Sequence, residues 1–162
     1  MLAVVCVATF LSVPVARADD DKCKEVEGRL VETAIPAPND PMGLSIGLST
    51  GDLKGSASSL LTSLTPQPDG TFLVTSLDVF VLGPQDILVL SCKTIGTPIQ
   101  GAPVGTVSAS TTYTVTGGTG KFLGATGTIQ ATSTVFNAFG PNAGPGSSYS
   151  VGNYKGTICR PH

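Results

Sequence analysis

The sequence has no tryptophan and only one histidine, His162, which is its final residue. A histidine at the end of a chain is more typical of a solvated tail than of a positioned base, so Ser-His and Cys-His catalytic arrangements are not expected. Zinc sites built from several histidines are also excluded, and the four cysteines show no Cys-x-x-Cys spacing that could replace them. We therefore expect no bound metal and no cofactor.

Charge is scarce as well. Charged residues make up 12% of the chain, with a formal net charge of −2, whereas about 25% is usual. Proteins that bind nucleic acid usually present a basic face. A nucleic-acid partner is therefore not expected.

No apolar run is long enough to span a bilayer, which needs about 20 residues. The apolar run at residues 2–15 is followed by Ala16-Arg17-Ala18, which fits the small-x-small pattern that signal peptidase cleaves. We predict that residues 1–18 are a cleaved signal peptide and that residues 19–162 form one domain. The mature protein would be secreted or periplasmic, with no membrane span. The alternative is an uncleaved anchor.

Glycine and proline are abundant, with 20 and 12 residues, and threonine and valine are frequent, which is typical of an all-β secreted domain. Residues 71–82 alternate along a strand, and both faces are largely apolar. We expect one face to line a barrel and the other to be covered by a neighbouring subunit or a loop. Turn-rich segments separate the predicted strands, which suggests a sandwich or a barrel of seven or eight strands. The strands are expected at 24–35, 43–61 (one or two), 71–82, 86–95, 104–116, 127–136 and 149–159.

The run GGTGKFLGATG at residues 117–127 superficially resembles a phosphate-binding loop. A P-loop needs Ser or Thr directly after its Gly-Lys pair, but Phe122 follows Gly120-Lys121, and Val115 stands where the first motif glycine belongs. A dinucleotide fingerprint would need a helix next, yet a strand pattern follows. We predict a turn between two antiparallel strands, with Phe122 and Leu123 closing one end of a barrel and Lys121 in solvent.

Three segments resemble a known family. TYTVTGGTGKFLGATGTIQATST at 112–134 and YKGTICRP at 154–161 are similar to bacterial relatives of the allene oxide cyclase and dirigent proteins, as is GLSTGDLKGS at 47–56. The resemblance implies an all-β fold, an eight-stranded antiparallel closed β-barrel with an apolar cavity, often in a homo-oligomer.

The resemblance leaves the activity open, because a fold alone does not give a function. The first hypothesis is a secreted barrel that binds a small apolar molecule and has no assigned reaction. The second is a cofactor-independent isomerase or cyclase that steers a reactive polyene, epoxide or fatty-acid derivative. A minor third is a structural surface protein without a ligand. An open pocket with convergent polar groups would favour the enzyme, and a filled interior would favour the structural protein.

Candidate catalytic residues are few. Strand alternation puts Glu25, Glu27, Arg29 and Val31 on one face. One interpretation places Glu27 and Arg29 inside the barrel mouth, as an acid and an anion or enolate stabiliser. The other places them on a solvated outer face as an ion pair.

Asp78 lies in mid-strand between Leu77 and Val79, where an ionised carboxylate needs a partner. It either points outward beside a Ser or Thr or is a cavity acid with a raised pKa. Tyr113 and Tyr154 either line a cavity or pack in the core.

The three cysteines of the mature chain allow three single bridges. With an even number of antiparallel strands, the first and last strands close the barrel, so Cys23 would lie beside Cys159. We predict that these two form a disulfide in the oxidising exterior and that Cys92 is a small buried apolar side chain. The alternative pairs Cys92 with Cys159.

Overall fold

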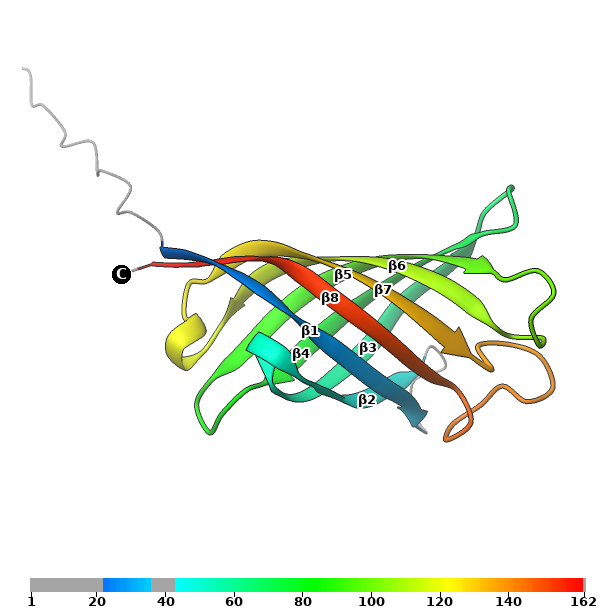
Figure 1. The fold of residues 1–162 in the computed structure, drawn as a ribbon, viewed down its shortest axis with the longest axis horizontal. Helices are drawn as coiled ribbons and strands as arrows, with labels where there is room; N and C mark the ends of the chain where they lie inside the picture. Colours follow the sequence, from blue (N-terminus) through cyan, green and yellow to red (C-terminus); the bar gives the residue numbers. More distant parts are fainter. Residues whose placement is uncertain (1–21, 36–42, 162) are drawn as a thin grey trace, which may run out of the picture.

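The structure, a computed structural model, describes residues 22–35 and 43–161. These residues form eight strands that pair in sequence order, each antiparallel to the next, and β8 pairs with β1 to close a barrel (Figure 1). The predicted fold class, a closed antiparallel eight-stranded β-barrel, is confirmed. The strands are β1 (Lys22–Ile35), β2 (Leu44–Ser49), β3 (Gly55–Pro66), β4 (Phe72–Val81), β5 (Ile87–Pro98), β6 (Val107–Gly118), β7 (Thr126–Phe136) and β8 (Tyr149–Arg160).

Alternation along the strands decides which side chains enter the barrel. On β4 the residues Phe72, Val74, Ser76, Asp78 and Phe80 face inward, as their pairing with inward residues of β3 and β5 requires. This confirms that one face of residues 71–82 lines the barrel. The opposite face is not covered by a loop, since Leu77 and Val81 are each 43% exposed.

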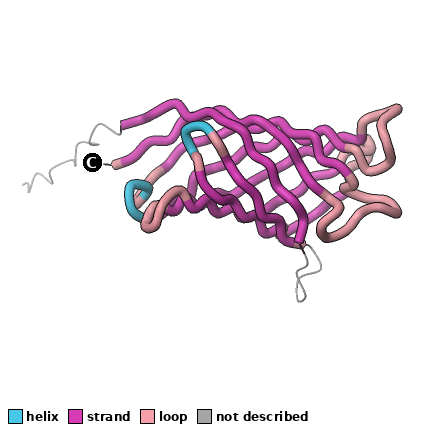
Figure 2. Tube along the Cα trace, turned by 60° about the horizontal axis from the view of Figure 1, so that its bottom comes forward, coloured by secondary structure: helices cyan, strands magenta, loops and turns pink. Residues whose placement is uncertain are grey.

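The two 3-10 turns lie toward one end of the barrel (Figure 2). The turn η1 (Gly51–Leu53) inserts Leu53, and the turn η2 (Gly120–Phe122) inserts Phe122, with exposed fractions of 2% and 1%. Both belong to the apolar core that fills this half of the barrel. At this end the strands therefore enclose packed side chains rather than open space.

The segment 117–127 is a turn between two antiparallel strands, as predicted. It leaves β6, forms η2 and begins β7. Phe122 closes the barrel as expected, but Leu123 does not, because it is 72% exposed. Lys121 is half exposed and pairs with Asp86, with Nζ 2.9 Å from Oδ2.

The loops that join β3 to β4, β5 to β6 and β7 to β8 lie at the other end of the barrel (Figure 2). The longest of these loops, 137–148, is stabilised by hydrogen bonds between its own residues. Ser148 Oγ donates to the carbonyl oxygen of Asn137 over 2.5 Å, and Asn137 Nδ2 donates to the carbonyl of Ser147 over 2.9 Å. These loops surround the end of the barrel that the core does not fill.

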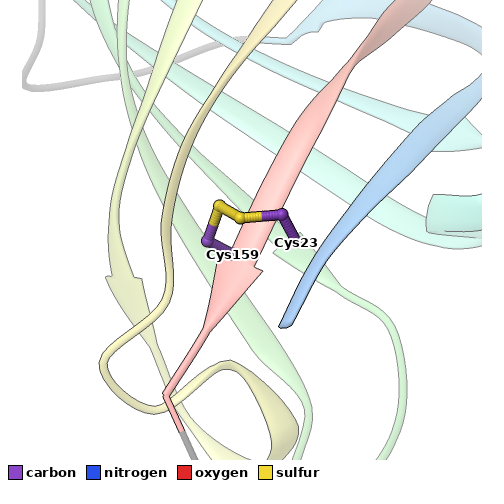
Figure 3. The surroundings of a disulfide bond; sticks show 2 residues. All are labelled: Cys23 and Cys159. Carbon is purple, nitrogen blue, oxygen red and sulfur yellow. A yellow bond between two sulfur atoms is a disulfide. The ribbon is translucent and has the colours of Figure 1, made fainter. Parts of the chain in front are cut away.

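Cys23 and Cys159 form a disulfide, as predicted (Figure 3). The two residues stand directly opposite each other on β1 and β8, with their Cα atoms 3.9 Å apart. The bridge therefore joins the first strand to the last at the seam where the barrel closes. Cys92 is unpaired and buried, which agrees with its predicted role as a small apolar core residue.

The predicted signal peptide, residues 1–18, and His162 lie outside the described residues. Within residues 22–35 and 43–161, no helix is long and apolar enough to cross a membrane.

Candidate functional site

A cavity of about 650 Å³ occupies the loop half of the barrel interior. Its walls come from residues of all eight strands, and its rim comes from the loops at that end, such as Gln67 and Phe139. The apolar part of the lining includes Leu30, Leu61, Leu64, Phe72, Val74, Val107, Ala109 and Val135. The interior is thus filled at one end and hollow at the other, so the barrel is not a solid core.

Asp78 lies at the inner end of this cavity. Its side chain is 3% exposed, and two serine hydroxyls, Ser59 Oγ at 2.6 Å and Ser76 Oγ at 2.7 Å, donate to its Oδ1. Burial raises the pKa of the Asp78 carboxyl, and the hydrogen bonds from Ser59 and Ser76 offset part of this effect. Of the two sequence interpretations, the cavity acid with a raised pKa agrees with the structure. Its serine partners lie inside the barrel with it.

Glu32 is the second acid in the cavity, and we did not single it out from the sequence. It faces inward from β1, and Ser45 Oγ donates to its Oε1 over 3.3 Å. Burial and the nearby Asp78 carboxylate raise the pKa of Glu32 from 4.5 to about 7, against the smaller opposing effect of Ser45. The alternation of side chains along a strand could have identified Glu32 from the sequence. Glu32 is an odd number of residues from Glu27, so it lies on the opposite face of β1.

Tyr113 and Cys92 complete the polar inner end. Tyr113 is 6% exposed, lines the cavity from β6, and meets the ring of Phe80 edge-on with centroids 6.5 Å apart. Burial and then the nearby carboxyls of Asp78 and Glu32 raise the pKa of the Tyr113 hydroxyl. Burial followed by the Asp78 charge raises the pKa of the Cys92 thiol. Both groups are therefore neutral and neither acts as a nucleophile at neutral pH.

Glu27 and Arg29 are not in the cavity, which corrects the interpretation that placed them inside the barrel mouth. Both are exposed on the outer face of β1, because they alternate with the inward residues Val26 and Leu30. They border a shallow outer hollow of about 840 Å³ that also includes Lys155. This hollow is larger than the interior cavity, but its exposed side chains mix charges of both signs and leave them in water. It brings together three of the residues singled out from the sequence, Glu27, Arg29 and Tyr154.

Tyr154 has a structural position. It is 4% exposed and faces inward in the closed half of the barrel. Its hydroxyl donates to the carbonyl of Thr50 over 2.6 Å and accepts from the N–H of Leu53 over 2.9 Å. Tyr154 thus holds the η1 plug in place, and it is not part of the cavity lining.

The arrangement can desolvate an apolar molecule and present it to two carboxyl groups and a phenol. Glu32 and Asp78 are the charged residues among the described lining of the cavity. Within the described residues, no group of three or more His, Cys, Asp or Glu side chains is placed to hold a metal ion. The groups that line the cavity can supply hydrogen bonds, negative charge and protons.

Comparison of the chain with protein-family models, with curated proteins and with solved structures finds no match.

Proposed function

We propose that the protein is a secreted barrel of the allene oxide cyclase and dirigent type that binds a small apolar molecule in its interior. The observation that supports this most is the cavity of about 650 Å³, whose walls are mostly apolar and whose rim lies among the loops at one end. Ligand pockets typically have volumes of about 300–1,000 Å³ and combine apolar walls with a few polar groups. A structural barrel without a ligand would instead have side chains filling its interior.

Secretion is part of the proposal. The Cys23–Cys159 disulfide supports it, because such bridges persist in oxidising compartments and are rare in the cytosol. The apolar run at residues 2–15 and the cleavage pattern at residues 16–18 supply the route.

The binding proposal is tested with Nile red, a neutral dye that fluoresces in apolar surroundings. Ser133 faces the cavity from β7, so Ser133→Phe places a ring in the cavity. Thr132→Phe adds the same ring on the exposed outer face of the same strand and is the matched control. We expect the wild type and Thr132→Phe to bind the dye at one saturable site, and Ser133→Phe to lose most of this binding. Equal binding by all three proteins, or no binding by the wild type, would contradict the proposal.

A second candidate function, an isomerase or cyclase, is favoured by the presence of Glu32, Asp78 and Tyr113 together in the lining of the cavity. An acid with a pKa of about 7 is half protonated near neutral pH, so Glu32 can donate a proton to an epoxide oxygen while the walls fix the fold of the chain. The test is the product distribution of a neutral allylic epoxide with the wild type and with Glu32→Gln, measured by chiral chromatography. An enzyme would change the distribution only when Glu32 is present.

A further inference from the structure

The cavity has an uncompensated charge distribution. Its described lining contains two carboxyl groups, Glu32 and Asp78, and no lysine, arginine or histidine. The two ion pairs of the described residues, Lys24–Asp52 and Lys121–Asp86, lie elsewhere on exposed side chains. An ionised carboxylate that is buried without a cationic partner costs free energy, because water no longer solvates it.

The hydrogen bonds to these acids are unevenly placed. Both serines that contact Asp78 donate to Oδ1, and Ser45 donates to Oε1 of Glu32. Among the described residues, no nitrogen or hydroxyl donates to Oδ2 of Asp78 or to Oε2 of Glu32 within hydrogen-bond distance. The Cys92 thiol is a further partner of Asp78. Within the described residues, each acid therefore keeps one oxygen without a nitrogen or hydroxyl donor.

Asp78 also has a defined depth. Along β4, the residues beyond Asp78 toward the loop end are Ser76, Val74 and Phe72, and all three line the cavity. On the other side of Asp78 is Phe80, which is 3% exposed and belongs to the packed core. A molecule that enters from the loops thus meets Phe72 and Val74 before it meets Asp78.

We infer that the cavity takes an apolar molecule that carries one amine, with the ammonium group against Asp78 and Glu32 and the apolar part toward the loops. The inference rests on the proposed function of the cavity and names the chemical class of its ligand. An ammonium supplies the missing donors and the missing positive charge in a site of low dielectric constant, where both are strongest. The same carboxyl groups disfavour fatty acids, because a third carboxylate would be buried beside two others without a cation.

The inference makes a prediction for pH. Tyr113 from β6 and Cys92 from β5 face the two acids and are neutral, so the charge of the inner end is set by Glu32 and Asp78. Glu32 ionises with a pKa of about 7. An ammonium ligand therefore binds more tightly as the pH rises through this value, and its binding releases a proton from Glu32.

The experiment compares octylamine, 1-octanol and octanoate, which share one chain length, as competitors for Nile red on the full mature chain. We expect octylamine to bind at least about tenfold more tightly than 1-octanol, and octanoate to bind more weakly than either. The advantage of octylamine should grow between about pH 6 and about pH 8, a range in which the free amine stays protonated.

Variants assign the effect to the acids. Asp78→Asn and Glu32→Gln keep the hydrogen-bond acceptors for the serines, and each should reduce octylamine affinity while 1-octanol affinity stays the same. Glu27→Gln, on the outer face, is the matched control and should change neither. If Asp78→Asn fails to fold, Glu32→Gln and the pH series still test whether the cavity acids cause the preference for octylamine.

The possible outcomes test the amine inference separately from the proposal that the cavity binds apolar molecules. If 1-octanol or octanoate binds as tightly as octylamine, the amine inference is wrong and the cavity still binds apolar molecules. If none of the three competes and Nile red itself does not bind, both are wrong. If octylamine is preferred but the preference is unchanged in both acid variants, the inference is also wrong, because the selectivity then comes from another surface.

Discussion

Ser45 on β2 donates a hydrogen bond of 3.3 Å to Oε1 of Glu32 on β1, inside the barrel wall. This contact favours the ionised form of Glu32, but burial and the nearby Asp78 oppose it and prevail, so the pKa of Glu32 rises to about 7. Glu32 therefore binds its proton more tightly in the folded protein than in the unfolded chain.

This relationship predicts how stability depends on pH. Because the pKa of Glu32 is higher in the folded state than the value of 4.5 in the unfolded state, the folded protein binds more protons between these two values, and stability falls as the pH rises through this window. The loss is on the order of 3 kcal/mol. Urea unfolding of the wild type and of Glu32→Gln measures it. Glu32→Gln should lose much less stability from about pH 4.5 to about pH 7, whereas Glu27→Gln should behave as the wild type. An identical pH dependence in Glu32→Gln would contradict the assignment.

The disulfide should make a large contribution to stability. Cys23 and Cys159 are 136 residues apart in sequence, and the chain-entropy estimate for closing such a loop is about 5 kcal/mol, an upper figure because it neglects strain. We expect Cys23→Ser combined with Cys159→Ser to lower the free energy of unfolding by several kcal/mol. Non-reducing peptide mapping of the mature protein is the accompanying check. A peptide that links Cys92 to either partner, or three free thiols, would show that the bridge is wrongly assigned.

The glycine-rich turn should not bind nucleotides. Lys121 pairs with Asp86 at the surface, where such an ion pair contributes at most about 1 kcal/mol. Lys121→Ala should therefore leave folding and ligand binding nearly unchanged, as thermal melting and Nile red titration can measure. If the wild type binds ATP or GTP and Lys121→Ala does not, the prediction that residues 117–127 form only a turn is wrong.

The outer face of β1 to β4 should mediate self-association. It exposes an apolar set on neighbouring strands, whereas the outer faces of β6 and β7 are rich in threonine. We propose that a second copy of the chain covers this apolar outer face, because monomers rarely expose contiguous apolar patches of this kind. The set comprises Val31, Ile46, Leu48, Leu60, Leu77 and Val81, with exposed fractions between 39% and 67%.

Light scattering on the mature chain tests this proposal. The wild type should be an oligomer, and the double variant Leu48→Lys with Leu77→Lys should be smaller. Thr114→Lys, on the exposed face of β6, places the same charge outside the patch and should leave the assembly intact. A monomeric wild type would overturn the proposal.

The strands could be predicted because alternation and turn residues are local signals. These signals left a sandwich or a barrel open, and the closed barrel was predicted from the family resemblance. The disulfide followed from topology, since an even number of antiparallel strands brings Cys23 beside Cys159. The single segment 43–61 became β2, η1 and β3, because Gly51 adopts a φ of 80° that favours glycine and turns the chain there.

The cavity could be predicted only in part. The alternation of β1 correctly grouped Glu27 with Arg29, but it could not say which face was inside, because both faces carry acids. In the structure Leu30 stands opposite Gly152 of β8, and Val26, Leu30 and Glu32 face inward. The position of Glu32 in the cavity therefore depends on how the strands pair, and no sequence motif marks it. The hollow itself depends on side-chain volumes from all eight strands, which no local pattern contains.

The central claim, that the loop half of the barrel interior binds a small apolar molecule, is tested most directly by backbone amide NMR during a titration with 1-octanol. The account predicts saturable shift changes at inward-facing residues of the cavity, such as Val74, Ala109 and Ser133, with little change in the packed half around Leu53 and Phe122. Shift changes confined to the apolar outer face at Leu48 and Leu77, or no saturable change at all, would contradict it.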